Sequence, residues 1–165
     1  MAVSRTANVT LVRSSFVDRA ICCYGGVVGF SSSSVMVDLS TFSNNTGSFR
    51  AVIYGSNSDI TIDHSTFTNN YYNEDPGFDS NGGAVHLSSG QLAILNSNFS
   101  DNNATGTGHG GAIYVSNGEL MISGSRFINN TAGHENGHGG AVFFSGGNIT
   151  VLNSTFVGNL SLIHI

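Results

Sequence analysis

The 165-residue sequence predicts an all-β fold, a right-handed parallel β-helix (solenoid) of about six coils. A block of residues recurs at intervals of 25 to 32 residues, a period typical of solenoids. Each block contains short segments in which apolar and more variable residues alternate, as in half-buried strands. No segment between them has the 3.6-residue period of a helix, which excludes a βαβ arrangement. We expect a right-handed solenoid because connections between parallel strands of one sheet are nearly always right-handed.

Each coil is anchored on a phenylalanine. A serine stands two positions before it, and aliphatic residues stand five and seven positions before it, in all six copies. Asparagine stands three positions after it in five copies, and Arg19 takes that place in the first. We expect the phenylalanine and aliphatic columns to fill the interior at steps of about 4.8 Å, and the asparagines to pass amide hydrogen bonds from coil to coil. The anchors are Phe16, Phe42, Phe67, Phe99, Phe127 and Phe156.

A Gly-Gly pair followed by a small and an aliphatic residue lies upstream of the anchor. All variation in length falls after the asparagine, which predicts loops on one side of a regular stack. The segment after the glycines, the aliphatic pair and the Ser-x-Phe segment together predict three strands in each coil. The alternation changes phase near Asp38-Leu39, which predicts a corner there. The copies are Gly82–Val85, Gly110–Ile113, Gly139–Val142 and the looser Gly25–Val28.

The repeat predicts a single domain over residues 1–159. Residues 160–165 match no column, and we expect this tail to be an artefact outside the fold. Neither end offers the polar cap that protects the last strands of a solenoid, so we interpret the chain as an internal fragment of a longer protein.

Composition and charge exclude several classes of protein. Ten acidic residues stand against five arginines and no lysine, so we expect no nucleic-acid partner. No apolar run approaches the roughly 18 residues needed to span a bilayer, and no signal peptide is visible. The adjacent Cys22 and Cys23 predict neither a disulfide framework nor a zinc site, and leave their redox state open.

The motifs Gly-Gly-Ala-[Ile/Leu/Val] and Phe-x-x-Asn, which alternate in fixed register, resemble the repeats of polymorphic outer-membrane proteins. The first motif occurs strictly three times and the second five times, over most of residues 25–159. The resemblance implies a right-handed, pectin-lyase-like β-helix. It also implies secretion or display at the cell surface, on the outer membrane if the source is bacterial, and adhesion to host or neighbouring surfaces.

Signals for a β-helix enzyme are incomplete. Gly108-His109-Gly110 and Gly137-His138-Gly139 match a polygalacturonase string, but both are the repeat position before Gly-Gly, and the other strings of that family are missing. Asp38 and Asp63 share a column in neighbouring coils, a spacing that suits a retaining glycosidase or a cation site, although repetition alone produces it. We therefore predict no enzyme, no catalytic residue, no cofactor and no metal.

Histidines also recur in one column. His109 and His138 are expected to stack in neighbouring coils, with His134 and Glu135 in the preceding loop. A weak transition-metal site is one interpretation of this group, and solvated loop histidines are the favoured one.

An aromatic column thirteen positions before the anchor is the first candidate ligand site. Its parity is opposite to that of the buried positions on either side, so it is expected to face outward and stack on sugar rings or on an apolar patch of a partner. The alternative is that the aromatic pairs only stabilise the sheet. The column contains Tyr54, His86, Tyr114 and Phe143.

The insertion after Asn70 is the second candidate. It is the longest departure from the repeat, and functional loops on solenoids tend to be such insertions. A plain surface turn is the alternative. The candidate contacts in this loop are Tyr71, Tyr72, Glu74, Asp75 and Phe78.

These observations predict a non-catalytic, adhesin-like β-helix module, extracellular or at the cell surface, that binds a glycan or a protein there. The alternative is a fragment of a polysaccharide-active enzyme, of the pectin lyase or polygalacturonase kind, whose active groups lie in missing coils. A purely structural coat or stalk component is a third possibility.

Overall fold

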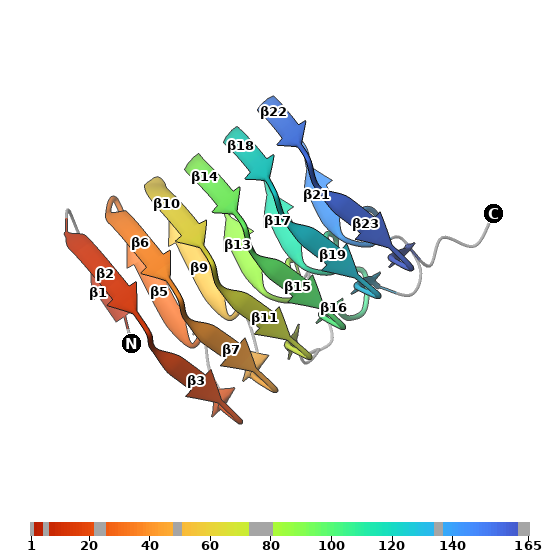
Figure 1. Cartoon of the computed structure of the whole chain (residues 1–165), viewed down its shortest axis with the longest axis horizontal. Helices are drawn as coiled ribbons and strands as arrows, with labels where there is room; N and C mark the ends of the chain where they lie inside the picture. The colour runs from red at the N-terminus through yellow and green to blue at the C-terminus, as the bar shows by residue number, and fades with distance from the viewer. Residues whose placement is uncertain are drawn as a thin grey trace.

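The computed structural model describes residues 2–4, 7–21, 26–47, 51–72, 81–133 and 137–161. Within these residues all regular structure is β-strand, in four parallel sheets of six strands each (Figure 1). Each coil contributes one strand to each of the sheets, which we call A, B, C and D in chain order. The predicted all-β parallel β-helix of about six coils is confirmed.

The four sheets differ in the length of their strands. Sheet A consists of β1 (Ala2–Ser4), β5 (Val28–Ser31), β9 (Ile53–Ser56), β13 (Val85–Leu87), β17 (Ile113–Val115) and β21 (Val142–Phe144). Sheet B consists of β2 (Asn8–Val12), β6 (Ser34–Asp38), β10 (Ser58–Asp63), β14 (Gly90–Leu95), β18 (Gly118–Ser123) and β22 (Gly147–Leu152). Sheet C consists of β3 (Ser15–Val17), β7 (Thr41–Ser43), β11 (Thr66–Thr68), β15 (Asn98–Ser100), β19 (Arg126–Ile128) and β23 (Thr155–Val157). Sheet D consists of β4 (Ala20–Ile21), β8 (Thr46–Gly47), β12 (Tyr71–Tyr72), β16 (Asn103–Ala104), β20 (Thr131–Ala132) and β24 (Leu160–Ser161).

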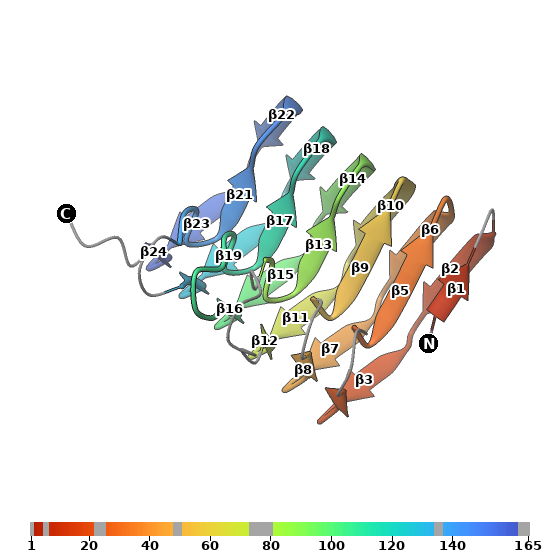
Figure 2. The same cartoon turned by 180° about the vertical axis from the view of Figure 1, so that it is seen from behind.

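Equivalent strands of neighbouring coils pair in register. In sheet B, Ile60 lies between Val35 and Leu92, which occupy the same repeat position. Figures 1 and 2 show equivalent strands side by side from the red N-terminal coil to the blue C-terminal coil. The sequence predicts three strands in each coil, whereas the structure has four, because a two-residue strand follows the asparagine column.

The phenylalanine column runs along the interior. The rings of Phe42, Phe67, Phe99 and Phe127 are fully buried and stack with centroids 4.7 to 5.0 Å apart. The aliphatic columns are buried beside them. Burying one such side chain contributes about 1.5–3 kcal/mol, so the stacked columns provide the main favourable free energy of folding.

The asparagine column forms the predicted chain of amide hydrogen bonds. Asn70 Nδ2 donates to Asn102 Oδ1 at 2.9 Å and to the carbonyl oxygen of Phe42 at 3.0 Å. Asn70 Oδ1 in turn accepts the backbone and side-chain N–H groups of Asn45. The buried amides are thus satisfied, which matters because one unsatisfied buried group costs about 1–3 kcal/mol.

The serine column is also buried, but its hydroxyls bond to the backbone. Ser65 Oγ accepts the backbone N–H of Ser40 at 3.1 Å and donates to the carbonyl oxygen of Asp63 at 2.8 Å. The same pair of bonds recurs in neighbouring coils. The hydroxyls therefore link the coils through the main chain at the corner between sheets B and C.

Two of the corners have one residue in the left-handed region in all six coils. The corner between sheets B and C has φ of 44° to 61°, and the corner between sheets C and D has φ of 52° to 64°. Leu39 occupies the first corner, which confirms the change of phase predicted at Asp38-Leu39. The first-corner residues are Arg13, Leu39, His64, Asn96, Gly124 and Asn153. The second-corner residues are Asp18, Asn44, Asn69, Asp101, Asn129 and Gly158.

Both glycines of the Gly-Gly motif are required by the backbone. Gly82, Gly110 and Gly139 have φ of 67° to 73°. A Cβ on the following Gly111 would overlap the carbonyl oxygen of Gly140 in the next coil. The motif thus permits a tight turn against the neighbouring coil before sheet A.

The C-terminal end of the described chain differs from the prediction. Leu160 and Ser161 form β24, which pairs with β20 in sheet D, so the prediction that residues 160–165 lie outside the repeat is wrong for these two. Residues 162–165 lie outside the described residues. In this last coil the inward Ile149, Val151 and Phe156 are 43 to 48% exposed, because their strands pair on one side only.

Candidate functional site

The aromatic column lies on the outer face of sheet A. Tyr54, His86, Tyr114 and Phe143 stand opposite one another on β9, β13, β17 and β21. Their side chains are half-buried, whereas the flanking Val85 and Leu87 of β13 are fully buried. The structure therefore brings all four residues of the predicted stacking face together.

The four rings are in mutual contact. His86 lies 5.1 Å from Tyr54 and 4.7 Å from Tyr114 between ring centroids, with its plane tilted by about 60° to each. Tyr114 and Phe143 are 5.4 Å apart and nearly parallel.

Two histidines extend this array beyond the four residues of the predicted aromatic column. His109 stacks on Phe143 with ring centroids 4.6 Å apart, and His138 stacks on His109 at 5.2 Å. The tight turn at Gly110 separates His109 from β17, and the histidine ring lies 6.5 Å from Tyr114. We call the six residues the aromatic cluster: Tyr54, His86, His109, Tyr114, His138 and Phe143.

A hydrogen bond joins the two histidines. The backbone N–H of His138 donates to His109 Nδ1 at 3.0 Å, so in neutral His109 the proton is on Nε2. This stacking confirms that the two histidines share a column, and the bond occupies one of the two nitrogens available to a metal. His134 and Glu135, the other members of the candidate metal site, lie outside the described residues.

The predicted binding loop is only partly described. Tyr71 is 40% exposed on β12, but Tyr72 points inward and is 2% exposed, so the prediction that Tyr72 contacts a ligand is wrong. It fits the interior because its partners in sheet D, Gly47 and Ala104, are small. Glu74, Asp75 and Phe78 lie outside the described residues.

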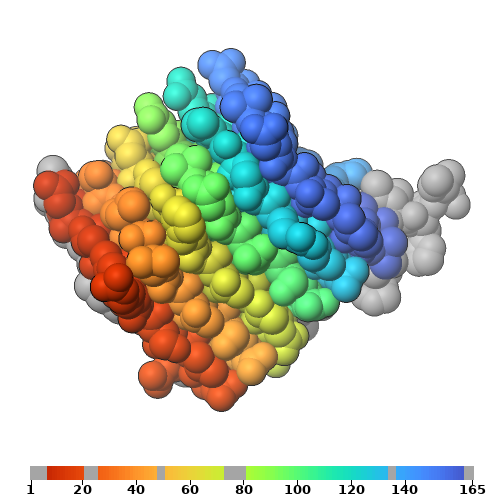
Figure 3. All heavy atoms as spheres, viewed as in Figure 1, coloured from red at the N-terminus to blue at the C-terminus, as the bar shows by residue number. Residues whose placement is uncertain are grey.

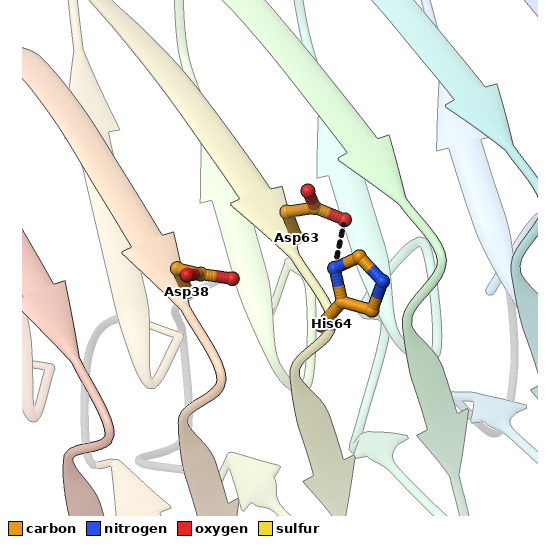
Figure 4. A group of neighbouring side chains, drawn as sticks. All are labelled: Asp38, Asp63 and His64. Atoms are coloured by element: carbon orange, nitrogen blue, oxygen red, sulfur yellow. Dashed lines mark ion pairs between the residues drawn. The ribbon is translucent and has the colours of Figure 1, made fainter.

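The carboxylates of Asp38 and Asp63 lie together with His64 on the outer side of sheet B (Figure 4). One ligand atom from each residue falls within 4.8 Å of the others. Asp63 Oδ1 is 2.9 Å from His64 Nδ1 and accepts a hydrogen bond from Asn96 Nδ2 at 3.1 Å. The group thus brings two half-buried carboxylates and one exposed imidazole together, whereas Ca²⁺ prefers six to eight oxygen ligands.

Comparisons with known proteins identify the fold family alone. Among the described residues, no helix is long and apolar enough to cross a membrane. The comparison with curated proteins found no match, and the comparison with solved structures found none either. The model of one family, described as a right handed beta helix region, matches residues 1–165. This match confirms the right-handed β-helix, and the resemblance to polymorphic outer-membrane protein repeats stays a prediction. The chain belongs to the right-handed β-helix family.

Proposed function

We propose that the chain is a non-catalytic binding module, adhesin-like and extracellular or displayed at the cell surface, which binds a glycan or protein partner through the aromatic cluster. The observation that carries the proposal is the contact of six rings from four neighbouring coils on the outer face of sheet A. The interior needs none of these rings, because it is filled by its own phenylalanine and aliphatic columns.

The cluster combines aromatic rings with side chains that carry polar groups. Tyrosine and histidine present an aromatic body together with a hydroxyl or an imidazole nitrogen, a combination suited to a partner with both apolar and hydrogen-bonding surface. Tyr54, His86 and Tyr114 supply these groups in three successive coils, at steps of about 4.8 Å. A saccharide chain or the rim of a protein surface matches such a row. The extracellular location rests on the resemblance of the repeats.

The test is a glycan array and a cell-binding assay with the whole chain and its Tyr114→Ala variant. We expect the variant to lose at least about fivefold in binding, corresponding to the roughly 1 kcal/mol of one lost aromatic contact. Val17→Ala is the control, because it removes an exposed apolar side chain from sheet C, away from every candidate site. Circular dichroism checks that both variants are folded. Unchanged binding by folded Tyr114→Ala contradicts the proposal.

One observation favours the second candidate, a polysaccharide-active enzyme. Asp38 and Asp63 are close enough for the two-carboxylate chemistry of a retaining glycosidase. The test is incubation of the chain with uronate and neutral polysaccharides, followed by chromatography of the products. Cleavage that disappears in Asp63→Asn supports the enzyme and contradicts the non-catalytic module.

A further inference from the structure

A trough runs along the outer face of sheet B. It consists of two hollows that meet at Asp59, one of about 430 Å³ and one of about 420 Å³. In every coil, the outward residue eight positions before the anchor phenylalanine lines this trough. Figure 3 shows the face of the molecule that carries sheets B and C. Five strand steps of about 4.8 Å make the row about 24 Å long. The six residues that define the sheet B trough are Asn8, Ser34, Asp59, Gln91, Glu119 and Asn148.

The hollow has a simple origin in side-chain size. The second outward column of sheet B contains Thr61, Ala93, Met121 and Thr150, all of which line the larger hollow. Ala93 has the smallest side chain of the four and lies between Thr61 and Met121 in the sheet. The smallest side chain on the floor is therefore on β14, the strand that also carries Gln91.

The trough is acidic and has no counter-charge of its own. Its carboxylates, Asp59 and Glu119, are exposed and make no hydrogen bond or ion pair with the described part of the chain. The six strands of sheet B contain no lysine, arginine or histidine. Asp38 and Asp63 add two more carboxylates to the same face, and His64, at the corner beyond the strand, pairs with Asp63. A ligand that complements this surface brings positive charge and N–H donors.

The spacing of the two carboxylates selects among cationic ligands. Asp59 and Glu119 are separated by Gln91, hence by two strand steps, or about 9.6 Å. A polyproline II peptide rises about 3.1 Å per residue with three residues per turn, so every third side chain returns to the same face after about 9.3 Å. In a β-strand the same face recurs every second residue, after about 6.7 Å, which does not fit.

We propose that the sheet B trough binds an extended basic peptide in the polyproline II conformation, with lysine or arginine at every third position opposite Asp59 and Glu119. The peptide lies along the solenoid axis and crosses the strands. About seven or eight residues span the 24 Å of the row. This site is on a different sheet from the aromatic cluster, so its test is independent of the test of the proposed function.

The test is fluorescence anisotropy of a labelled nonapeptide with lysines at positions 1, 4 and 7 and proline or alanine elsewhere, titrated with the whole chain. We expect saturable binding that weakens as salt is added. Asp59→Asn and Glu119→Gln each weaken binding about two- to fivefold, and the double variant about tenfold. Both substitutions introduce residue types that the column already carries at Asn148 and Gln91, so the fold is preserved.

Two controls separate this site from general attraction between charges. Asp101→Asn removes an exposed carboxylate at the corner between sheets C and D and leaves binding unchanged. A peptide of equal charge with lysines at positions 1, 3 and 5 binds more weakly. Equal loss in Asp101→Asn, equal affinity of the two peptides, or binding of glucosamine oligomers without binding of the peptide overturns the proposal.

Discussion

Inward and outward side chains of the same strand follow different rules. In β11 the inward Phe67 lies between two identical rings, those of Phe42 and Phe99. The outward Thr66 on the same strand lies between Thr41 and Asn98. An inward side chain must fill the space that its neighbours leave, because too small a side chain leaves a cavity and too large a one clashes, whereas an outward side chain meets solvent. The repeat thus constrains the interior and leaves the outer faces free to carry different chemistry.

Function in such a molecule is therefore to be sought on the outer faces of its sheets. The outer face of sheet A carries the aromatic cluster, and the outer face of sheet B carries the acidic trough, although both rest on the same interior. One repeating scaffold thus holds an aromatic surface and an acidic surface at a fixed distance from each other.

The largest difference between inward and outward positions is expected in β11. Phe67→Ala removes a fully buried ring and should lower the free energy of unfolding by about 3–5 kcal/mol. Thr66→Ala on the same strand should change it by less than about 0.5 kcal/mol. Urea unfolding followed by circular dichroism measures both values. Similar losses in the two variants contradict the comparison.

The asparagine column provides the next largest effect. Asn70→Ala leaves the backbone and side-chain N–H groups of Asn45 and the carbonyl oxygen of Phe42 without their present partner, and should lower the free energy of unfolding by at least about 2 kcal/mol. Asn69→Asp is the neighbouring control, since aspartate already occupies that corner at Asp18 and Asp101. We expect less than about 0.5 kcal/mol for the control in the same urea titration. A loss in Asn70→Ala no larger than that of the control refutes the role of the column.

A stabilising change is expected at the corner between sheets B and C. Leu39 has φ of 50° and is 46% exposed, so it gains little from burial while adopting a conformation that costs a non-glycine residue about 1–2 kcal/mol. Leu39→Asn, which copies Asn96 and Asn153, should raise the free energy of unfolding by about 1 kcal/mol. Leu39→Ala should give no such gain. Thermal melts of both variants measure the difference, and an equal shift refutes the explanation.

The smallest effect is expected where two glycines of sheet A differ only in direction. Gly29 faces outward in register with Tyr54, and an added Cβ would meet no atom within 4 Å. Gly29→Tyr should extend the aromatic cluster and raise the free energy of unfolding by about 0.5 kcal/mol. A Cβ on the inward Gly55 would lie 2.7 Å from Ile60 Cδ1, so Gly55→Ala should destabilise the fold. Urea unfolding of the two variants should give changes of opposite sign, and a loss of stability in both contradicts the prediction.

The interior could be predicted from sequence because its columns are made of identical residues. Phe, Ser and Asn recur at fixed offsets, and the stacking of identical side chains from neighbouring coils is sufficient to explain this recurrence. Sheet D was missed because its strands are two residues long, too short for a period to be read, and differ from one coil to the next. The same variety concealed the burial of Tyr72, which depends on Gly47 and Ala104 in the neighbouring coils.

The outer surfaces could be predicted only in part. The parity of the aromatic column placed Tyr54, His86, Tyr114 and Phe143 on one face, but nothing local indicated that His109 and His138 join them after a tight turn. Their recurrence one position before Gly-Gly was the available signal. The sheet B trough was missed because a hollow depends on the relative sizes of side chains in neighbouring strands, which a one-dimensional pattern does not show.

The asparagine column gives the solenoid a chemical direction. From Asn45 to Asn130, each side-chain amide in the column donates to the asparagine of the next coil and accepts an N–H from the coil before it. An inverted coil would set donor against donor, so any additional turn has to join with the same sense. The two ends of the solenoid are therefore chemically different, as the plus and minus ends of a filament are. A ligand that lies along the solenoid axis consequently meets the coils in a defined order.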